Sequence, residues 1–193
     1  MKARRHLLGA SLGAGLSVLL VAGCATVRPP DAPGPVLSGR LAWQVAATAE
    51  QPARQASALF DLRGTAERGS LDLSSALGTT LARARWEPGQ AELSSSAAGV
   101  QRFTGLDELA QSAFGEPVPL AALFDWLRGR PWAGAPHDPV SAAERQPGGI
   151  AGPIGFRQLG WEVDLSGLAQ GLLSARRAAE PVVTLRLRLE APS

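Results

Sequence analysis

Apolar and polar residues alternate along many short segments of the chain, a pattern typical of strands whose two faces meet different surroundings. Leu41, Trp43 and Val45, for example, are separated by alanine and glutamine, and near the C-terminus leucine alternates with charged residues. The segments with this period are 40–45, 58–63, 71–73, 80–86, 91–93, 100–103, 161–165 and 184–190. Because glycine, proline and serine lie between them, they predict an antiparallel sheet with one covered face.

Two segments in the middle of the chain have the longer apolar period of helices. The first covers 105–114, with Thr104 as its expected N-cap and Gly115 as its expected stop. The second begins at Pro119, which suits the first turn of a helix, and ends before Gly129. Its apolar residues fall three and four positions apart and form one stripe: Leu120, Leu123, Phe124 and Leu127.

The segment 129–155 is rich in glycine and proline, and we expect a long loop there, with one short helix around 140–145. Many strands and a few helices predict an α+β fold. A sheet that curls around helices encloses a space, and an inner face of leucine, tryptophan and phenylalanine makes that space suitable for an apolar ligand.

The first 24 residues have the three parts of a secretory signal peptide. Lys2, Arg4 and Arg5 precede an uncharged, mostly apolar run, which ends in Val-Ala-Gly at 21–23 and Cys24. This ending resembles a lipobox, so cleavage before Cys24 and lipidation of that cysteine are expected. Cys24 is the single cysteine of the chain, and an unpaired cysteine in an exported protein needs an explanation that lipidation supplies. The alternative is an ordinary secreted protein with a chance cysteine.

The expected organisation is therefore a signal peptide at 1–23, a lipidated cysteine with a flexible tether at 24–39, and one folded domain at 40–193. The tether carries four prolines among few apolar side chains, which favours an extended conformation. Ala25 follows the cysteine instead of aspartate, and in lipoproteins of this kind that implies sorting to the outer membrane.

Composition excludes several classes of chemistry. Cleavage removes three of the 19 basic residues and none of the 17 acidic ones, which leaves a net charge of −1 and no reason to expect nucleic acid. The mature chain has no lysine and one histidine, His137, in the expected loop. A P-loop, a Schiff-base lysine and a Ser-Lys dyad are therefore excluded. With His137 alone, neither a zinc site nor an enzyme is expected, although a catalytic base at His137 stays an alternative.

Five segments, in order, resemble the LolB family, the outer-membrane lipoprotein receptors of the Lol lipoprotein-sorting pathway. They are Gly-Arg-Leu-Ala at 39–42, Ser-Ala-Leu-Gly-Thr-Thr at 75–80, Val-Pro-Leu at 118–120 with Trp-Leu-Arg-Gly at 126–129, Phe-Arg-Gln-Leu-Gly-Trp at 156–161, and Leu-Arg-Leu-Arg-Leu at 185–189. The resemblance covers residues 39–189. It implies a half-open antiparallel β-barrel with helices as a lid over an apolar cavity.

The resemblance also implies a function and its partners. The expected protein is lipid-anchored on the periplasmic side of the outer membrane, accepts cargo lipoproteins from a LolA-like periplasmic carrier, and inserts them into the outer-membrane lipid. It is expected to be a monomer with no cofactor beyond the covalent lipid on Cys24. The alternative function is that of a structural outer-membrane lipoprotein that docks a protein partner, which a filled core without a continuous cavity would favour.

Two sets of residues are the candidates for this activity. The expected lining of the acyl-chain cavity is Trp43, Phe60, Leu123, Phe124 and Trp161. Each of these is equally well explained as ordinary packed core. Leu77 lies in the connector 74–78, where the family carries a protruding leucine, and it is expected to act in membrane insertion; the alternative is that it folds back onto the sheet edge.

Overall fold

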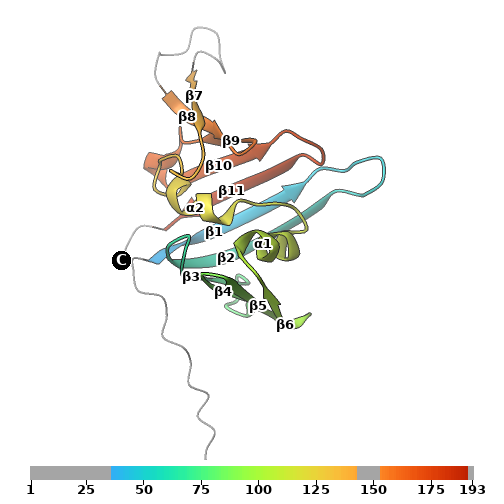
Figure 1. The fold of residues 1–193 in the computed structure, drawn as a ribbon. Coiled ribbons are helices and arrows are strands. Elements are labelled where there is room, and N and C mark those ends of the chain that lie inside the picture. Colours follow the sequence, from blue (N-terminus) through green and yellow to red (C-terminus); the bar gives the residue numbers. More distant parts are fainter. Residues whose placement is uncertain (1–35, 143–152, 191–193) are drawn as a thin grey trace, which may run out of the picture. The chain divides into compact units, whose positions relative to one another are not determined.

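In the computed structural model, residues 36–142 and 153–190 are described, and all of them belong to the unit Asp31–Ser193. They form one antiparallel sheet with two α-helices and a short 3-10 helix, Leu168–Gln170 (Figure 1). The strands are β1 (Val36–Val45), β2 (Arg54–Gly64), β3 (Gly69–Ser74), β4 (Thr80–Glu87), β5 (Gln90–Ser95), β6 (Gly99–Phe103), β7 (His137–Ser141), β8 (Pro153–Gln158), β9 (Trp161–Asp164), β10 (Leu172–Arg177) and β11 (Val183–Leu189). The α+β expectation is confirmed.

The first and last strands of the described region meet in the middle of the sheet. The order is β6-β5-β4-β3-β2-β1-β11-β10-β9-β8-β7, so each half is a meander that grows outward from the β1–β11 pair. Leu41 lies opposite Leu187 in that pair, and Gly39 lies opposite Leu189. Within the described residues β6 and β7 are the two ends of the sheet and do not pair with each other, so the sheet is not closed.

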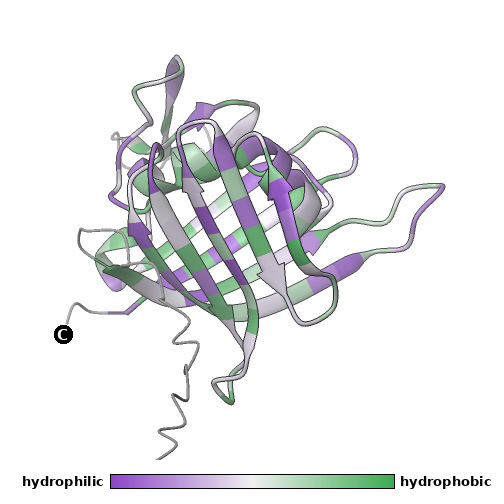
Figure 2. Cartoon of the chain, turned by 60° about the horizontal axis from the view of Figure 1, so that its bottom comes forward, coloured by the Kyte–Doolittle hydropathy of each residue, from purple (hydrophilic) through white to green (hydrophobic). Residues whose placement is uncertain are grey.

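Alternation along the strands explains why the sheet has a covered face. In β11, Val183, Leu185 and Leu187 are buried while Arg186 and Arg188 are exposed. Figure 2 shows the resulting bands of hydrophobic and hydrophilic residues along the strands. The apolar face packs against helices α1 (Leu106–Phe114) and α2 (Leu120–Trp126), and the residues between form one core.

The start of α1 differs from the expectation. Gly105, not Thr104, occupies the N-cap, and no side chain caps the helix. Instead the backbone N–H of Thr104 donates to the Glu108 carboxylate at 3.0 Å, an interaction that lowers the pKa of Glu108, with a further lowering from the Thr104 hydroxyl. Gly115 ends the helix in the left-handed conformation, as expected, with φ of 68°.

The expected long loop at 129–155 holds for residues 129–136, which form no helix or strand, but is wrong further on. His137–Ser141 forms β7, and β8 already begins at Pro153. Pro139 argues against a strand in the sequence, because proline has no N–H to donate to a neighbouring strand. Strand β7 is the last strand in the order, and an edge strand tolerates a proline at this position. His137 is thus an exposed strand residue, not a loop residue.

The other differences are small. Of the short helix expected at 140–145, Val140 and Ser141 are strand, Ala142 is helical, and 143–145 lie outside the described residues. Strand β10 was not expected, because only Leu173 and Ala175 mark its buried face. No helix in the ranges 36–142 and 153–190 is both long and apolar enough to span a bilayer.

Candidate functional site

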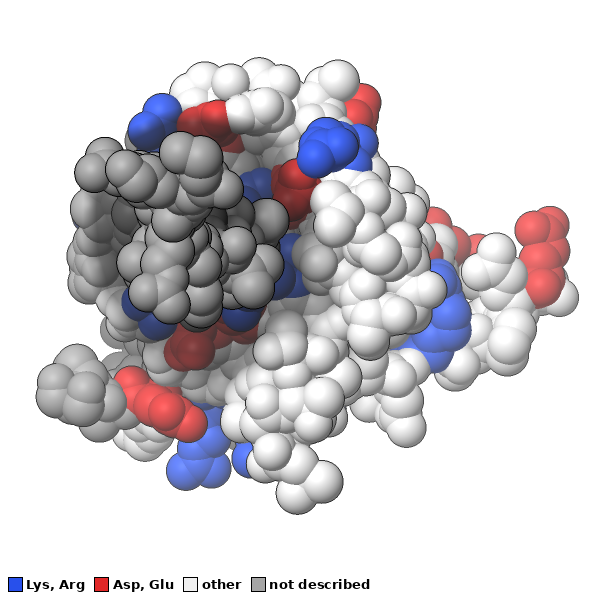
Figure 3. Space-filling model, turned by 90° about the horizontal axis from the view of Figure 1, so that it is seen from below, with Lys and Arg blue, Asp and Glu red and all other residues white. Residues whose placement is uncertain are grey.

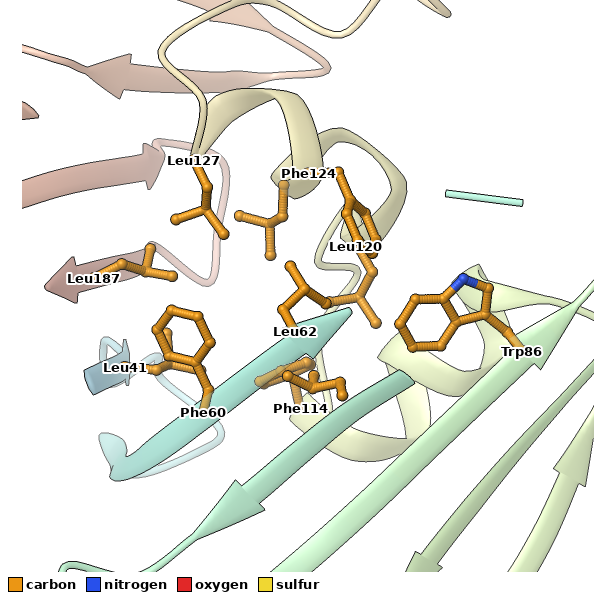
Figure 4. Close-up of a pocket in the computed structure, with 11 residues that line it drawn as sticks. Leu41, Phe60, Leu62, Trp86, Phe114, Leu120, Phe124, Leu127 and Leu187 are labelled. Atoms are coloured by element: carbon orange, nitrogen blue, oxygen red, sulfur yellow. The ribbon is translucent and has the colours of Figure 1, made fainter. Parts of the chain in front are cut away.

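An apolar pocket lies between the sheet and helix α2 (Figure 4). Its lining residues come from the covered face of the sheet, from the end of α1 and from the stripe of α2: Leu41, Phe60, Leu62, Leu71, Trp86, Leu187, Phe114, Leu120, Leu123, Phe124 and Leu127. The free space is only about 30 Å³, enough for one or two water molecules. The pocket is therefore nearly filled by its own side chains.

Aromatic contacts fix the positions of the side chains around the pocket. The rings of Trp86 and Phe124 meet edge to face with centroids 5.8 Å apart, which joins β4 to α2. Trp86 Nε1 donates to the Thr65 carbonyl at 3.0 Å, so the polar edge of this ring is satisfied away from the pocket. Such edge-to-face pairs stabilise by about 0.5–1.5 kcal/mol beyond the area that they bury.

The structure brings three of the five expected cavity residues together. Phe60, Leu123 and Phe124 line the pocket. Trp43 lies outside its lining, with its ring 6.4 Å from that of Phe114. Trp161 also lies outside it, buried behind α2 with its ring 6.4 Å from Trp126. Sequence alternation places both tryptophans on the covered face correctly but does not say how far along that face the pocket extends.

An ionic clamp fastens the connector between the two helices to the sheet. The Glu116 carboxylate, which is buried, accepts a hydrogen bond from Arg54 at 2.9 Å and another from Arg177 at 2.7 Å. Arg54 stands at the start of β2 and Arg177 at the end of β10, so Glu116 bridges strands on both sides of the β1–β11 pair. Arg177 also donates to the Pro181 carbonyl at 3.1 Å.

A second polar anchor holds the C-terminal side of α2. Gln158 on β8 is buried, and its Oε1 accepts a hydrogen bond from Trp126 Nε1 at 2.8 Å and from the Trp132 amide at 2.9 Å. Its Nε2 donates to the carbonyls of Trp132 and Ala135. Neither Gln158 nor Glu116 is identified by sequence periodicity, because each lies far in sequence from its partners.

A wider groove lies beside the helix connector, whose residues 117–119 form part of its lining. It has a volume of about 350 Å³ and is lined by Asp107, Pro117, Val118, Pro119, Ala121, Ala122, Trp132, Leu159, Trp161 and Arg177. Leu159, in the β8–β9 turn, is 46% exposed and has a positive φ of 54°, a conformation that non-glycine residues rarely adopt. This groove is more polar than the pocket and is separate from it.

Leu77 stands at the tip of the β3–β4 hairpin and is 95% exposed. The turn is well defined: the Ser75 hydroxyl accepts hydrogen bonds from the amides of Leu77 and Thr79, and Gly78 has a φ of 81°. Leu77 therefore does not fold back onto the sheet edge in this structure. Leaving it in water forgoes about 1.5–3 kcal/mol of burial.

Charged groups take no part in the pocket. Figure 3 shows the charged side chains of one face scattered between wide uncharged areas. Besides Glu108, Glu67 has a lowered pKa, because the Thr65 hydroxyl donates to it, and both carboxylates are exposed. Across the described ranges no group of three or more histidine, cysteine or acidic residues is arranged to hold a metal ion. Cys24 lies outside the described residues.

Comparison with known proteins gives consistent results. A sequence model of the family described as "Outer membrane lipoprotein LolB" matches residues 36–190. The outer-membrane lipoprotein LolB of Bordetella petrii is 38% identical over 162 residues, 80% of this chain and 76% of that protein. The proteins of the same name from Bordetella pertussis and Ralstonia nicotianae are 34% and 33% identical, over 78% and 77% of this chain and 75% and 72% of their own length.

Proposed function

The chain belongs to the LolB family of outer-membrane lipoproteins and acts as the outer-membrane receptor of the Lol lipoprotein-sorting pathway, and we propose that the apolar pocket under α2 takes the acyl chains of its cargo. This role is one of trafficking, not catalysis, and it implies a LolA-like carrier that delivers lipoproteins and a cargo that is handed on. The observation that carries the proposal is a pocket lined entirely by apolar side chains from the sheet and both helices.

The chemistry of the cargo matches this lining. Exposing an acyl chain to water costs roughly 0.8 kcal/mol per methylene, or about 11 kcal/mol for a chain of about fourteen methylenes. A protein that passes such chains on must shield them from water without polar contacts, because each polar contact would require the ligand to bind in one orientation. Leucine and phenylalanine side chains give non-directional contact, which suits acyl chains of different length.

The pocket must widen before a chain can enter. About 30 Å³ is far too small for an acyl chain, so the stripe of α2 occupies the space that cargo would fill. In our proposal the sheet is a half-open barrel and the two helices are its lid. Loading moves α2 away from Phe60 and Leu62, and the acyl chain replaces the helix side chains against the same strands.

The remaining sites follow from this role. We assign Cys24 as the lipidated residue that anchors the protein, with 1–23 removed. The tether is shorter than the expected 24–39, because residues 36–39 already belong to strand β1. Leu77 would enter the outer membrane during delivery, because an exposed leucine on a hydrogen-bonded turn can separate lipid headgroups next to the acyl chains. The protein would work as a monomer, with outer-membrane lipid as the final acceptor.

One observation favours the alternative of a structural lipoprotein that docks a partner. A nearly filled core is what that alternative predicts. The two functions differ in whether apolar ligands bind at all. A fluorescent fatty-acyl probe whose absorption overlaps tryptophan emission should bind at micromolar concentration, quench the protein's emission, and be displaced by lipoprotein. Absence of binding would contradict the acyl-chain pocket and favour the structural role.

Matched tryptophan variants locate the probe. Trp86 lines the pocket and Trp132 lines the separate groove. Trp86→Phe should remove a large part of the probe-dependent quenching, whereas Trp132→Phe should remove little. The reverse result would place the acyl chain in the groove beside the helix connector, and the proposal for the pocket would be wrong.

A further inference from the structure

A cluster of arginines on the outer face of the sheet has no role in the pocket. Arg40 on β1 lies directly opposite Arg188 on β11, and Arg186 follows two residues away on the same face. All three side chains are exposed, and none makes an ion pair within the described ranges. We call Arg40, Arg186 and Arg188 the arginine patch.

The patch is unfavourable for folding. Residues directly opposite on antiparallel strands lie about 5 Å apart, and like charges at such positions destabilise a sheet. The neighbouring acids do not pair with it: Asp61 accepts a hydrogen bond from Ser38 at 2.6 Å, and Asp164, in the row of Arg186 and Ser174, accepts one from the Ser166 amide at 2.8 Å. Glu190, which is exposed two residues beyond Arg188, lies at the edge of the patch and leaves it with a positive charge. A cluster with this arrangement is suited to an anion from outside the chain.

Apolar side chains flank the arginine patch in the same row of the sheet. The row, read across the strands, is Leu172, Arg188, Arg40, Leu59, Ser74 and Thr80. Leu172 at one end is 46% exposed, and Ser74 and Thr80 at the other end form the base of the hairpin that carries Leu77. Unpaired arginines next to the exposed Leu172 and near the hairpin that carries Leu77 match a surface that offers both anionic headgroups and apolar chains.

The chain length before β1 favours a membrane as the occupant. Eleven residues lie between Cys24 and Val36, so the twelve steps from one to the other reach at most about 43 Å when fully extended. If Cys24 carries the lipid, the start of β1 stays within that distance of the bilayer, and Arg40, four residues further on, lies at most about 14 Å beyond it. An acidic soluble protein is not held near this face by such a tether.

From these observations we propose that the outer face of β1, β10 and β11 is a docking surface for anionic lipid headgroups of the membrane that anchors the protein. The guanidinium groups of the arginine patch bind headgroup phosphates, while Leu172 and the Leu77 hairpin contact the apolar layer. This proposal rests on the proposed anchoring at Cys24, and it adds an orientation: docking turns one defined face of the domain toward the lipid.

Energy transfer on the anchored mature protein tests the docking. A donor dye is attached at Ser174→Cys, opposite Arg186 on the outer face, or at Ala97→Cys in the β5–β6 turn as reference. The acceptor is a headgroup-labelled lipid. One set of vesicles contains phosphatidylethanolamine and the anionic lipid phosphatidylglycerol, and the other contains phosphatidylethanolamine and the uncharged lipid phosphatidylcholine. Energy transfer from position 174 should be higher in the anionic vesicles, and raised salt should abolish this difference. Equal transfer in both vesicles would overturn the proposal.

Charge-matched variants distinguish the effect of the arginine patch on docking from the effect of the protein's net charge. Arg40→Gln with Arg188→Gln should lower the docking equilibrium about 25-fold, at about fivefold for each arginine, and should leave the thermal midpoint equal or higher. Arg68→Gln with Arg102→Gln removes the same charge from arginines paired with Glu87 and Glu92 and should change docking little. Equal loss in both pairs would overturn the assignment. If the first pair fails to fold, Arg186→Gln alone should still show the fivefold loss.

Lipoprotein acceptance and delivery, measured on the same vesicles, separate this proposal from the function itself. Wild-type protein that docks but does not deliver would contradict the proposed function and support docking. Protein that delivers without docking would overturn docking alone. Loss of acceptance from the carrier in the Arg40→Gln and Arg188→Gln variant, with unchanged energy transfer, would identify the patch as a protein-binding site and overturn the lipid proposal.

Discussion

At the scale of single residues, Leu77 is the most informative position, because it is a large apolar side chain that is 95% exposed on a hydrogen-bonded turn and has no packing role. Leu77→Glu should change the free energy of unfolding by no more than about 0.5 kcal/mol, as expected for an exposed position. Cargo acceptance should stay near normal, whereas transfer of lipoprotein to liposomes should fall at least tenfold, because a carboxylate cannot enter the apolar layer. Transfer assays and thermal midpoints check both parts.

Val100→Glu provides the control for this variant. Val100 is 56% exposed on β6, so the substitution adds the same charge at an exposed apolar position of another strand. It should transfer lipoprotein normally. Normal transfer by a folded Leu77→Glu protein, or an equal loss in both variants, would remove the special role of the hairpin.

Gly39 shows why one position of the 39–42 motif must be glycine. It is buried in β1, and a Cβ there would overlap the Arg188 carbonyl of β11. Gly39→Ala should therefore force β1 and β11 apart in the centre of the sheet and lower the free energy of unfolding by about 1–3 kcal/mol. Denaturant unfolding measures this, with Gly105→Ala as the control, since a Cβ at Gly105 meets open space. Equal stability of the two variants would contradict the close approach.

At the scale of secondary-structure elements, the clamp around Glu116 decides how firmly the helices are held on the sheet. Glu116→Gln should lower the free energy of unfolding by about 2–3 kcal/mol. This is below the 3–5 kcal/mol expected for a fully buried pair, because the Arg54 side chain is 37% exposed and partly screened. If the helices act as a lid, the variant should also take up an acyl probe faster than the wild-type protein.

Glu92→Gln serves as the control for the clamp. Glu92 pairs with Arg102 at 3.3 Å on exposed strands, and its loss should change stability by less than about 1 kcal/mol. Chemical unfolding gives the stabilities and stopped-flow fluorescence gives the uptake rates. An unchanged uptake rate in a destabilised Glu116→Gln protein would show that the clamp supports the fold without controlling entry.

Sequence patterns predicted some helices and strands correctly and missed others, and the difference has physical reasons. Alternation identified β1 and β11 because leucine and arginine mark opposite faces clearly. It missed β7, because Pro139 is compatible with a strand only at a sheet edge, and a single sequence does not reveal which strand is the edge. The stripe of α2 was predicted correctly, because helical spacing is local information.

At the scale of the whole molecule, the contacts that build the site join residues far apart in the chain. Glu116 lies about sixty residues from each of its two arginine partners, and Gln158 holds a tryptophan 32 residues away. The arginine patch likewise forms only when β1 and β11 pair. Periodicity assigns a residue to a face, but register and packing decide its neighbours, and the small size of the pocket depends on both.

Anchoring of the whole molecule is tested by the mass of the protein extracted from membranes. Loss of residues 1–23 together with added acyl mass on Cys24 is the expected result, because the segment before it has the charged start and apolar run of a signal peptide. Cys24→Ser should leave the chain uncleaved at this site and without acyl mass. An unmodified Cys24 in the mature protein would contradict the anchor and would also remove the basis of the docking surface.

The central claim is that cargo acyl chains lie under α2 against the covered face of the sheet. The most direct measurement is photo-crosslinking: lipoprotein with a photoreactive group near the end of an acyl chain is loaded onto the receptor, and the crosslinked residues are mapped by mass spectrometry. The account predicts crosslinks to Phe60, Leu123 and Phe124, lost when unlabelled lipoprotein competes. Crosslinks confined to the groove around Trp132 and Leu159, or to the outer face of the sheet, would contradict it.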